Sequence, residues 1–255
     1  MGPVLGLDDA IVVNNLSKRF RIPHERKITV YDRLVGLLRG GSYTYEEFWA
    51  LDDVSFTVKK GETFGVIGPN GCGKSTLLKV LAGVLYPDGG GISIGGKIAP
   101  FLELGVGFQP ELTARENIYL YGAIMGLSRK EIDERYEEIL GFAELKRFEN
   151  MKLRNFSSGM YVRLAFSTAI QADPDVLLVD EVLAVGDEAF QKKCGEKIEE
   201  IRRRGKTILL VSHAMGTVKE LCERCMLLNG GRIASMGETD KVLAEYVRMM
   251  GDGSG

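Results

Sequence analysis

The sequence has few of the residues that disulfide and zinc chemistry require. It contains four cysteines and two histidines among 255 residues, and only Cys222 and Cys225 have the spacing of a redox or zinc pair. No second pair and no histidine pair accompanies them, which disfavours a zinc site. We expect ordinary, half-buried thiols in a reducing compartment.

Long apolar runs and an excess of one charge are also missing. No stretch approaches the roughly 20 apolar residues that span a bilayer, and Met1 to Pro3 lack the basic start and apolar run of a signal peptide. The net charge is -2, which argues against a broad electrostatic grip on nucleic acid or acidic lipid. We expect a cytoplasmic protein, long enough for one large or two modest domains, with no nucleic-acid partner.

Three short apolar runs predict buried parallel strands, because apolar and polar residues do not alternate along them. Helical patterns lie between these runs, which indicates an α/β fold. The runs are Thr63–Ile67, Val176–Val179 and Thr207–Val211.

The rest of the chain has a different organisation. We expect a smaller, partly antiparallel sheet from residues 11–13 and 54–58, and a hairpin at Asn229-Gly230-Gly231. The whole chain is interpreted as a single domain, residues 1–255. Its core comprises 1–109 and 173–250, and a helical subdomain over 110–172 has predicted helices at 116–125, 129–140 and 158–171. A last helix is expected at 241–250, and 251–255 as a flexible tail.

Residues 21–49 form an unusual segment whose role the pattern leaves open. Val30, Leu34, Leu37 and Leu38 have the spacing of an apolar helical stripe. The stripe fits a surface helix folded onto its own core, and it also fits a docking element for a membrane partner.

A phosphate-binding loop follows the strand that ends at Ile67. It fits G-x-x-x-x-G-K-[ST] at every fixed position, and a helical pattern at 77–85 comes next. Glycines let the backbone wrap an anion, Lys74 is expected to reach the outer phosphates, and Ser75 to ligate Mg²⁺. The loop comprises Gly68, Pro69, Asn70, Gly71, Cys72, Gly73, Lys74, Ser75 and Thr76.

Three further candidates follow the other two apolar strands. Asp180 and Glu181 end the strand over 176–179, where Asp180 is expected to hold Mg²⁺ and Glu181 to polarise an attacking water. His213 follows the strand over 207–211, at the same predicted sheet edge as Lys74, so we expect it to contact the γ-phosphate.

A second turn with the features of an anion-binding site lies far downstream, in the sequence FSSGM at 156–160. Small residues run directly into a helix, where backbone N–H groups and the helix dipole favour an anion. The chain therefore carries two turns that are suited to binding phosphate.

Together these motifs resemble the nucleotide-binding subunit of an ABC transporter over nearly the whole chain. The resemblance implies a P-loop NTPase of ABC type, with a mostly parallel sheet, a small antiparallel β subdomain and an inserted helical subdomain. Besides the phosphate loop, the matching stretches are Gly107–Pro110 (Q-loop), Phe156–Met160 (signature, usually LSGGQ), Asp180-Glu181 (Walker B), Ala184–Asp187 (D-loop) and His213 (switch histidine).

The resemblance also implies a division of labour. Two copies pair head to tail as a homodimer that sandwiches ATP. Gln109 touches metal and water, and Phe20 stacks on adenine, with Tyr31, Tyr43 or Trp49 as alternatives. The residues expected at the partner's nucleotide are Ser157, Ser158, Gly159, Met160 and Asp187. Phe156, Ser158 and Met160 depart from the usual signature without removing its N–H groups.

The signature, Q-loop and D-loop sequences are similar to those of the polysaccharide-export branch of the family, O-antigen exporters in particular. This implies a peripheral ATPase at the cytoplasmic face of the bacterial inner membrane, which drives a lipid-linked polysaccharide through an integral-membrane permease. Other cargoes (teichoic acid, capsule, lipid, peptide or drug) remain open. A soluble ABC factor in translation or DNA repair is disfavoured by the single cassette, and a non-hydrolysing regulatory cassette by the intact Lys74, Glu181 and His213.

Overall fold

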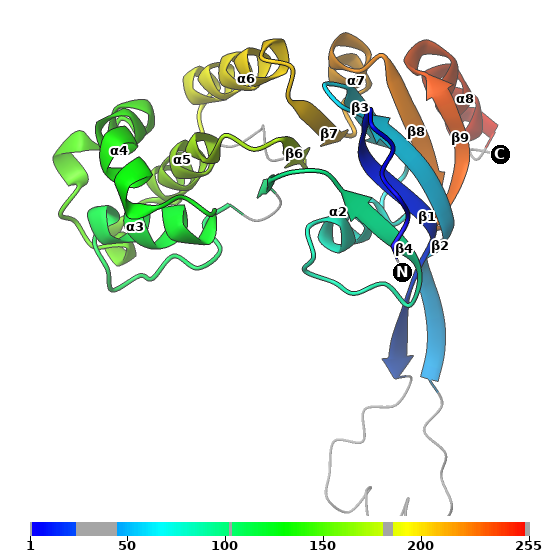
Figure 1. Ribbon diagram of the computed structural model, residues 1–255, viewed down its shortest axis with the longest axis horizontal. Helices are drawn as coiled ribbons and strands as arrows, with labels where there is room; N and C mark the ends of the chain where they lie inside the picture. Colours follow the sequence, from blue (N-terminus) through cyan, green and yellow to red (C-terminus); the bar gives the residue numbers. More distant parts are fainter. Residues whose placement is uncertain (1, 24–44, 102–103, 181–185, 253–255) are drawn as a thin grey trace, which may run out of the picture.

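The computed structural model describes residues 2–23, 45–101, 104–180 and 186–252, whose strands form two sheets (Figure 1). The larger sheet has six strands in the order β5-β6-β7-β3-β8-β9, and all neighbours are parallel except β8 and β9. The strands are β3 (Thr63–Ile67), β5 (Ile98–Phe101), β6 (Val176–Val179), β7 (Thr207–Val211), β8 (Arg224–Asn229) and β9 (Arg232–Glu238).

The three predicted parallel strands are confirmed, and every residue of β3, β6 and β7 is buried. The predicted hairpin at Asn229-Gly230-Gly231 is also confirmed, since it joins β8 to β9. Because β6, β7 and β3 are parallel neighbours, the segments that follow them leave the sheet at one edge.

The smaller sheet is antiparallel and has the order β2-β1-β4. It consists of β1 (Asp9–Pro23), β2 (Tyr45–Lys59) and β4 (Gly89–Ile94). Its apolar face packs on the larger sheet and on α2 (Lys74–Leu81): Phe56 of β2 stacks on Phe64 of β3 with ring centroids 5.8 Å apart. This core holds the start of α2, and therefore the phosphate loop, against both sheets.

The remaining helices divide into two groups. In Figure 1, α3 (Ala114–Ile124), α4 (Arg129–Ala143) and α5 (Ser158–Ala169) lie together on one side of the molecule. Of these, α5 meets the larger sheet: its Phe166 packs edge-on against Phe101 of β5, with ring centroids 5.5 Å apart. Capping boxes fix the starts of α3 (Thr113 with Glu116) and α4 (Ser128 with Glu131). The other helices, α6 (Glu188–Arg203), α7 (Met215–Leu221) and α8 (Thr239–Asp252), lie beside the six-stranded sheet.

Several details differ from the sequence prediction. The helix expected over 77–85 is α2, which begins at Lys74 and ends at Leu81. Helix α8 runs to Asp252, so Gly251 and Asp252 continue a helix that was expected to end before them. The four cysteines are free and buried rather than half-buried, because they pack into the two apolar clusters of the core. The apolar stripe at 30–38 and residues 253–255 lie outside the described residues.

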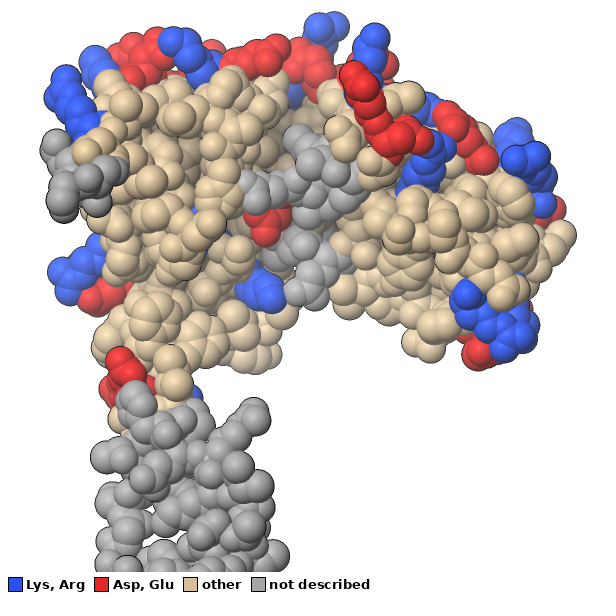
Figure 2. Space-filling model, turned by 180° about the vertical axis from the view of Figure 1, so that it is seen from behind, with Lys and Arg blue, Asp and Glu red and all other residues tan. Residues whose placement is uncertain are grey.

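The described part of the chain offers neither a resident metal cluster nor a membrane span. It has no group of three or more His, Cys, Asp or Glu side chains placed to hold a metal ion. None of its helices is both long and apolar enough to cross a bilayer. Both signs of charge are interspersed on the face drawn in Figure 2, most densely along its upper edge.

Candidate nucleotide-binding site

The phosphate loop is a tight backbone turn that only glycine permits at two positions. Gly68 (φ 149°) and Gly73 (φ 111°) have positive φ. An added Cβ would lie 2.1 Å from the carbonyl oxygen of Leu228 at the first and 2.3 Å from that of Ala50 at the second. Gly73 is also the N-cap of α2, and no side chain caps the helix. The first N–H groups of α2 therefore point toward the loop, where an anion can accept from them.

Lys74 is held inside this loop. Its side chain is buried, and Nζ donates to the carbonyl oxygens of Gly68 (2.7 Å) and Pro69 (2.9 Å). Sγ of Cys72 is 3.8 Å from the same nitrogen, and burial raises the pKa of this thiol. A bound phosphate can therefore replace the two carbonyls as the hydrogen-bond acceptor of the Lys74 ammonium group.

Most of the phosphate loop, Asp180 and His213, which follow the three parallel strands, meet in one cleft of about 450 Å³. Asp180 is half-buried after β6, and His213 is exposed two residues after β7. Ser212, between β7 and His213, is buried and its Oγ accepts from the N–H of Ala214 at 3.0 Å, which fixes the turn. The cleft is lined by Phe20, Phe48, Ala50, Asn70, Gly71, Gly73, Lys74, Ser75, Thr76, Asp180 and His213.

An aromatic wall closes one side of the cleft. Phe20 of β1 pairs with Phe48 of β2 across the antiparallel ladder, and the two residues are 38% and 45% exposed. Sequence reasoning missed Phe48; the signal that could have found it is its cross-strand position opposite Phe20. Trp49 is not among the cleft residues, and its ring faces the Arg19 guanidinium at 5.7 Å. Tyr31 and Tyr43 lie outside the described residues.

Two of the three predicted magnesium ligands share the cleft. Ser75 supplies a hydroxyl oxygen and Asp180 a carboxylate oxygen, which suits an ion that takes one or two protein oxygens beside phosphate and water. Gln109, the third, is exposed on the loop before α3 and does not line the cleft.

Asn117 fixes the backbone at Gln109, and sequence reasoning missed it. Its side chain is fully buried on α3. Oδ1 accepts from the N–H of Gln109 at 2.7 Å, and Nδ2 donates to the carbonyl of Gln109 at 3.0 Å and to those of Leu112 and Thr113. A buried amide with this many partners is costly to replace. The place of Gln109 is thus set by the start of the helical group.

The second turn suited to binding phosphate opens α5, away from the cleft. Ser157 is the N-cap, and its hydroxyl accepts from the N–H of Met160 at 3.2 Å. Ser157 and Ser158 are exposed, and Gly159 and Met160 are half-buried. None of the four lines the cleft. The chain therefore presents the two turns on different surfaces.

Asp187 is the N-cap of α6 and forms local interactions rather than lining the cleft. Oδ1 accepts from the N–H of Phe190 at 2.9 Å as the N-cap, and Oδ2 pairs with Arg163 of α5. Both interactions, the cap first, hold the pKa of this carboxyl below its usual value. Glu181, the predicted water-polarising base, lies outside the described residues.

Comparison with known proteins identifies the class to which this site belongs. Residues 51–184 match the family model described as ABC transporter. A solved structure of the ATP-binding subunit of an ABC transporter superposes with a TM-score of 0.72 at 27% identity, over 93% of each chain. The chain therefore belongs to the ABC transporter family, which confirms the α/β P-loop fold of ABC type.

Relatives narrow the resemblance to one branch. The ABC transporter protein AbcA of Aeromonas salmonicida is 51% identical to this chain. The match covers 80% of this chain and 66% of the length of AbcA. The O-antigen export system ATP-binding protein RfbB of Klebsiella pneumoniae is 42% identical over 96% of this chain and 100% of its own length. The teichoic acids export ATP-binding protein TagH of Listeria innocua is 38% identical over 95% of this chain and 71% of its own length. The predicted similarity to polysaccharide exporters is confirmed.

Proposed function

We propose that this chain is the ATP-hydrolysing subunit of a polysaccharide exporter. Two copies close around ATP and drive a lipid-linked polysaccharide, O-antigen in the first instance, through a separate membrane subunit. The observation that carries the proposal is the single cleft in which the phosphate loop, Asp180, His213 and an aromatic wall meet. A triphosphate, its metal and a planar base each have a matching group there.

Each part of the cleft has a distinct role. The N–H groups of the loop and of the start of α2 hold the phosphates, and Lys74 neutralises the outer two. Ser75 and Asp180 hold Mg²⁺, which when bound shields the negative charge of the phosphates. His213 contacts the γ-phosphate and Glu181 orients the attacking water. Phe20 and Phe48 receive the adenine ring.

The γ-phosphate needs a second set of donors, and the turn at Ser157–Gly159 supplies it from the partner copy. Because the two serines of this turn are exposed and the turn lies outside the cleft of its own chain, it is available to another copy. Head-to-tail pairing then places the turn and Asp187 of each copy over the nucleotide of the other. Hydrolysis removes the phosphate that bridges the two copies, so the pair opens.

The cargo is argued from relatives rather than from sugar-binding residues. The chain matches an O-antigen export protein over that protein's whole length at 42% identity, which favours O-antigen as the cargo. The match to TagH makes teichoic acid the second candidate. In either case the chain works at the cytoplasmic face of the membrane and contacts the permease, and its ATP site does not touch sugar.

Purification of this chain together with the membrane subunit of its transporter tests this proposal. We expect the complex to hydrolyse ATP, and lipid-linked O-antigen to stimulate hydrolysis several-fold more than the same lipid without glycan. Lipid-linked teichoic acid is the matched comparison. Equal hydrolysis with glycan-bearing and glycan-free lipid would contradict the assignment of cargo.

Phe48→Ala should weaken ATP binding about tenfold, because half of the aromatic wall is lost; a factor of ten corresponds to about 1.4 kcal/mol. Binding of fluorescent ATP to the purified chain measures the effect. Trp49→Ala is the control, since Trp49 is equally exposed on β2 but faces Arg19. Equal losses in both variants would show that Phe48 does not contact the base.

A further inference from the structure

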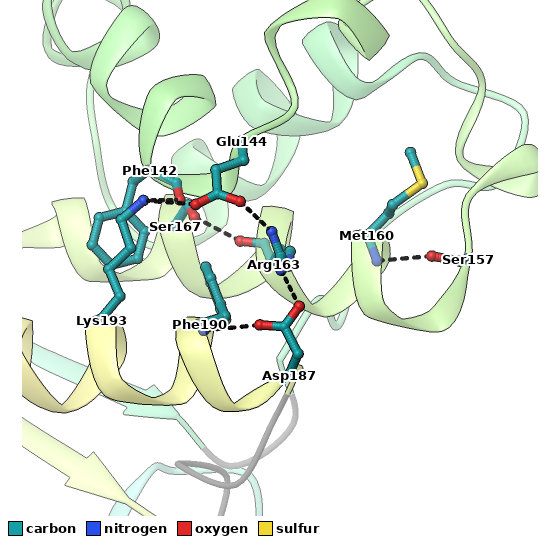
Figure 3. A network of polar contacts seen from close by, with 9 residues as sticks. All are labelled: Phe142, Glu144, Ser157, Met160, Arg163, Ser167, Asp187, Phe190 and Lys193. Atoms are coloured by element: carbon teal, nitrogen blue, oxygen red, sulfur yellow. Dashed lines mark hydrogen bonds and ion pairs between the residues drawn. The ribbon is translucent and has the colours of Figure 1, made fainter.

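A charged and aromatic cluster joins the helical group to the start of α6 (Figure 3). Arg163 of α5 is its centre. Nη1 donates to Glu144 Oε2 at 2.7 Å, and Nη2 donates to Asp187 Oδ2. Glu144 follows α4 as its C-cap, in the left-handed region (φ 62°). One guanidinium therefore bridges a carboxylate of the helical group and the N-cap carboxylate of α6.

A second cation reinforces the same boundary from the other side. Lys193 of α6 donates from Nζ to the carbonyl of Phe142 at 2.9 Å and to Glu144 at 3.4 Å, and it lies 4.7 Å from the centroid of the Phe142 ring. Glu144 thus accepts one hydrogen bond from Arg163 of α5 and one from Lys193 of α6. The Arg163 bond, the largest cause, lowers the pKa of Glu144.

Arg163 differs from a surface cation in its burial and packing. Its side chain is 18% exposed, and the guanidinium lies 5.0 Å from the centroid of the Phe190 ring. Phe190 is itself buried, and packs edge-on against Phe142 (5.8 Å) and Phe166 (6.0 Å). Exposed ion pairs fix geometry poorly, whereas a guanidinium that binds two carboxylates through separate nitrogens and lies against a buried ring has little freedom.

The bridge connects the two segments that the proposed function sends to the partner's nucleotide. Arg163 lies on α5, whose first turn carries Ser157–Gly159, and Asp187 starts α6. We propose that Arg163 is a positioning residue, which locks the signature turn and Asp187 into one unit so that both reach the partner's nucleotide together. This inference rests on the proposed head-to-tail dimer.

A double-mutant cycle tests whether Arg163 couples the signature turn to Asp187. Arg163→Met keeps an unbranched chain over Phe190 but removes the charge. Asp187→Asn keeps the N-cap, because asparagine caps as well as aspartate, but weakens the pair. We expect each change to weaken ATP-driven dimerisation about tenfold, and the double variant to be no weaker than either single one, since both break the same link. ATP affinity of the monomer should not change.

The measurement is sedimentation of the full chain with a non-hydrolysable ATP analogue. The control is Lys146→Met with Glu137→Gln, an exposed ion pair at 2.9 Å within the helical group. We expect it to leave dimerisation unchanged. Arg163→Lys, which keeps the charge but loses the planar guanidinium with its two separate terminal nitrogens, should give an intermediate loss. It replaces Arg163→Met in the cycle if the latter does not fold.

The outcomes separate this inference from the proposed function. If the losses from the two substitutions multiply in the double variant, Asp187 acts on the partner independently of Arg163, and the proposed positioning role of Arg163 is wrong. An Arg163→Met variant that dimerises like the unmodified chain would also contradict that role. Failure of the unmodified chain to dimerise with ATP would instead contradict the proposed dimer.

Discussion

Lys74→Ala should lower ATP hydrolysis by at least about 100-fold, since removing even one preorganised neutral donor to a developing oxyanion typically costs that much. Lys74 is the buried cation of the loop, with Nζ 2.7 Å from the carbonyl of Gly68. Among the described residues that line the cleft, no other lysine or arginine could balance the charge that develops on the outer phosphates. Release of inorganic phosphate by the purified chain measures the effect.

Lys60→Ala is the control for Lys74→Ala. Lys60 follows β2 and its Nζ donates to the carbonyl of Leu7 at 2.7 Å, so the same charge is removed outside the nucleotide cleft. It should hydrolyse ATP like the unmodified chain. A Lys74→Ala variant that keeps more than about a third of the activity would mean that the loop does not hold the hydrolysed phosphates.

Ser157→Arg should abolish ATP-driven dimerisation while the monomer still binds ATP. The substitution places a large cation at the exposed turn that is proposed to meet the partner, and we expect the dimer to weaken by at least about 30-fold, or about 2 kcal/mol. Sedimentation with a non-hydrolysable ATP analogue measures the dimer, and fluorescent ATP measures the monomer.

Loss of helix capping must be separated from this effect, because Ser157 is the N-cap of α5. Ser128→Arg is the matched control: Ser128 caps α4 in the same way, by accepting from the N–H of Glu131, and its loss costs about 1 kcal/mol. We expect this control to dimerise. Equal dimerisation of both arginine variants would remove the turn from the interface.

Mixing the two inactive variants gives a further readout of the same pairing. In a mixed dimer, the intact loop of the Ser157→Arg copy faces the intact turn of the Lys74→Ala copy. The mixture should therefore hydrolyse ATP although neither variant does so alone. Loop and turn acting within one chain would leave the mixture inactive.

The strands with a clear apolar pattern or turn signal were predicted, including the antiparallel pairing of β1 with β2 and the β8–β9 hairpin, whereas two strands without such a signal were missed. Apolar runs predicted β3, β6 and β7 within the observed bounds. Strand β4 was missed because its sequence, GGGISI, begins with three glycines and forms by pairing with β1. Strand β5 contains Pro100, which is tolerated because β5 is at the edge of its sheet.

The site shows the same division. The loop residues that line the cleft, with Asp180 and His213, were predicted, because parallel strands bring their carboxyl ends to one edge. Phe48 and Asn117 were missed because their roles depend on register and on packing. Gln109 and Asp187 were predicted at the nucleotide, and their place there stays a prediction, since their nearest partners are Asn117 and Arg163.

The most direct test is a structure of the Glu181→Gln variant with ATP, in which bound nucleotide should survive because water activation is removed. The account predicts a head-to-tail dimer in which the N–H of Gly159 lies about 3 Å from a γ-phosphate oxygen held by Lys74 of the other copy. An ATP-bound structure in which Gly159 contacts no nucleotide of either copy would contradict it.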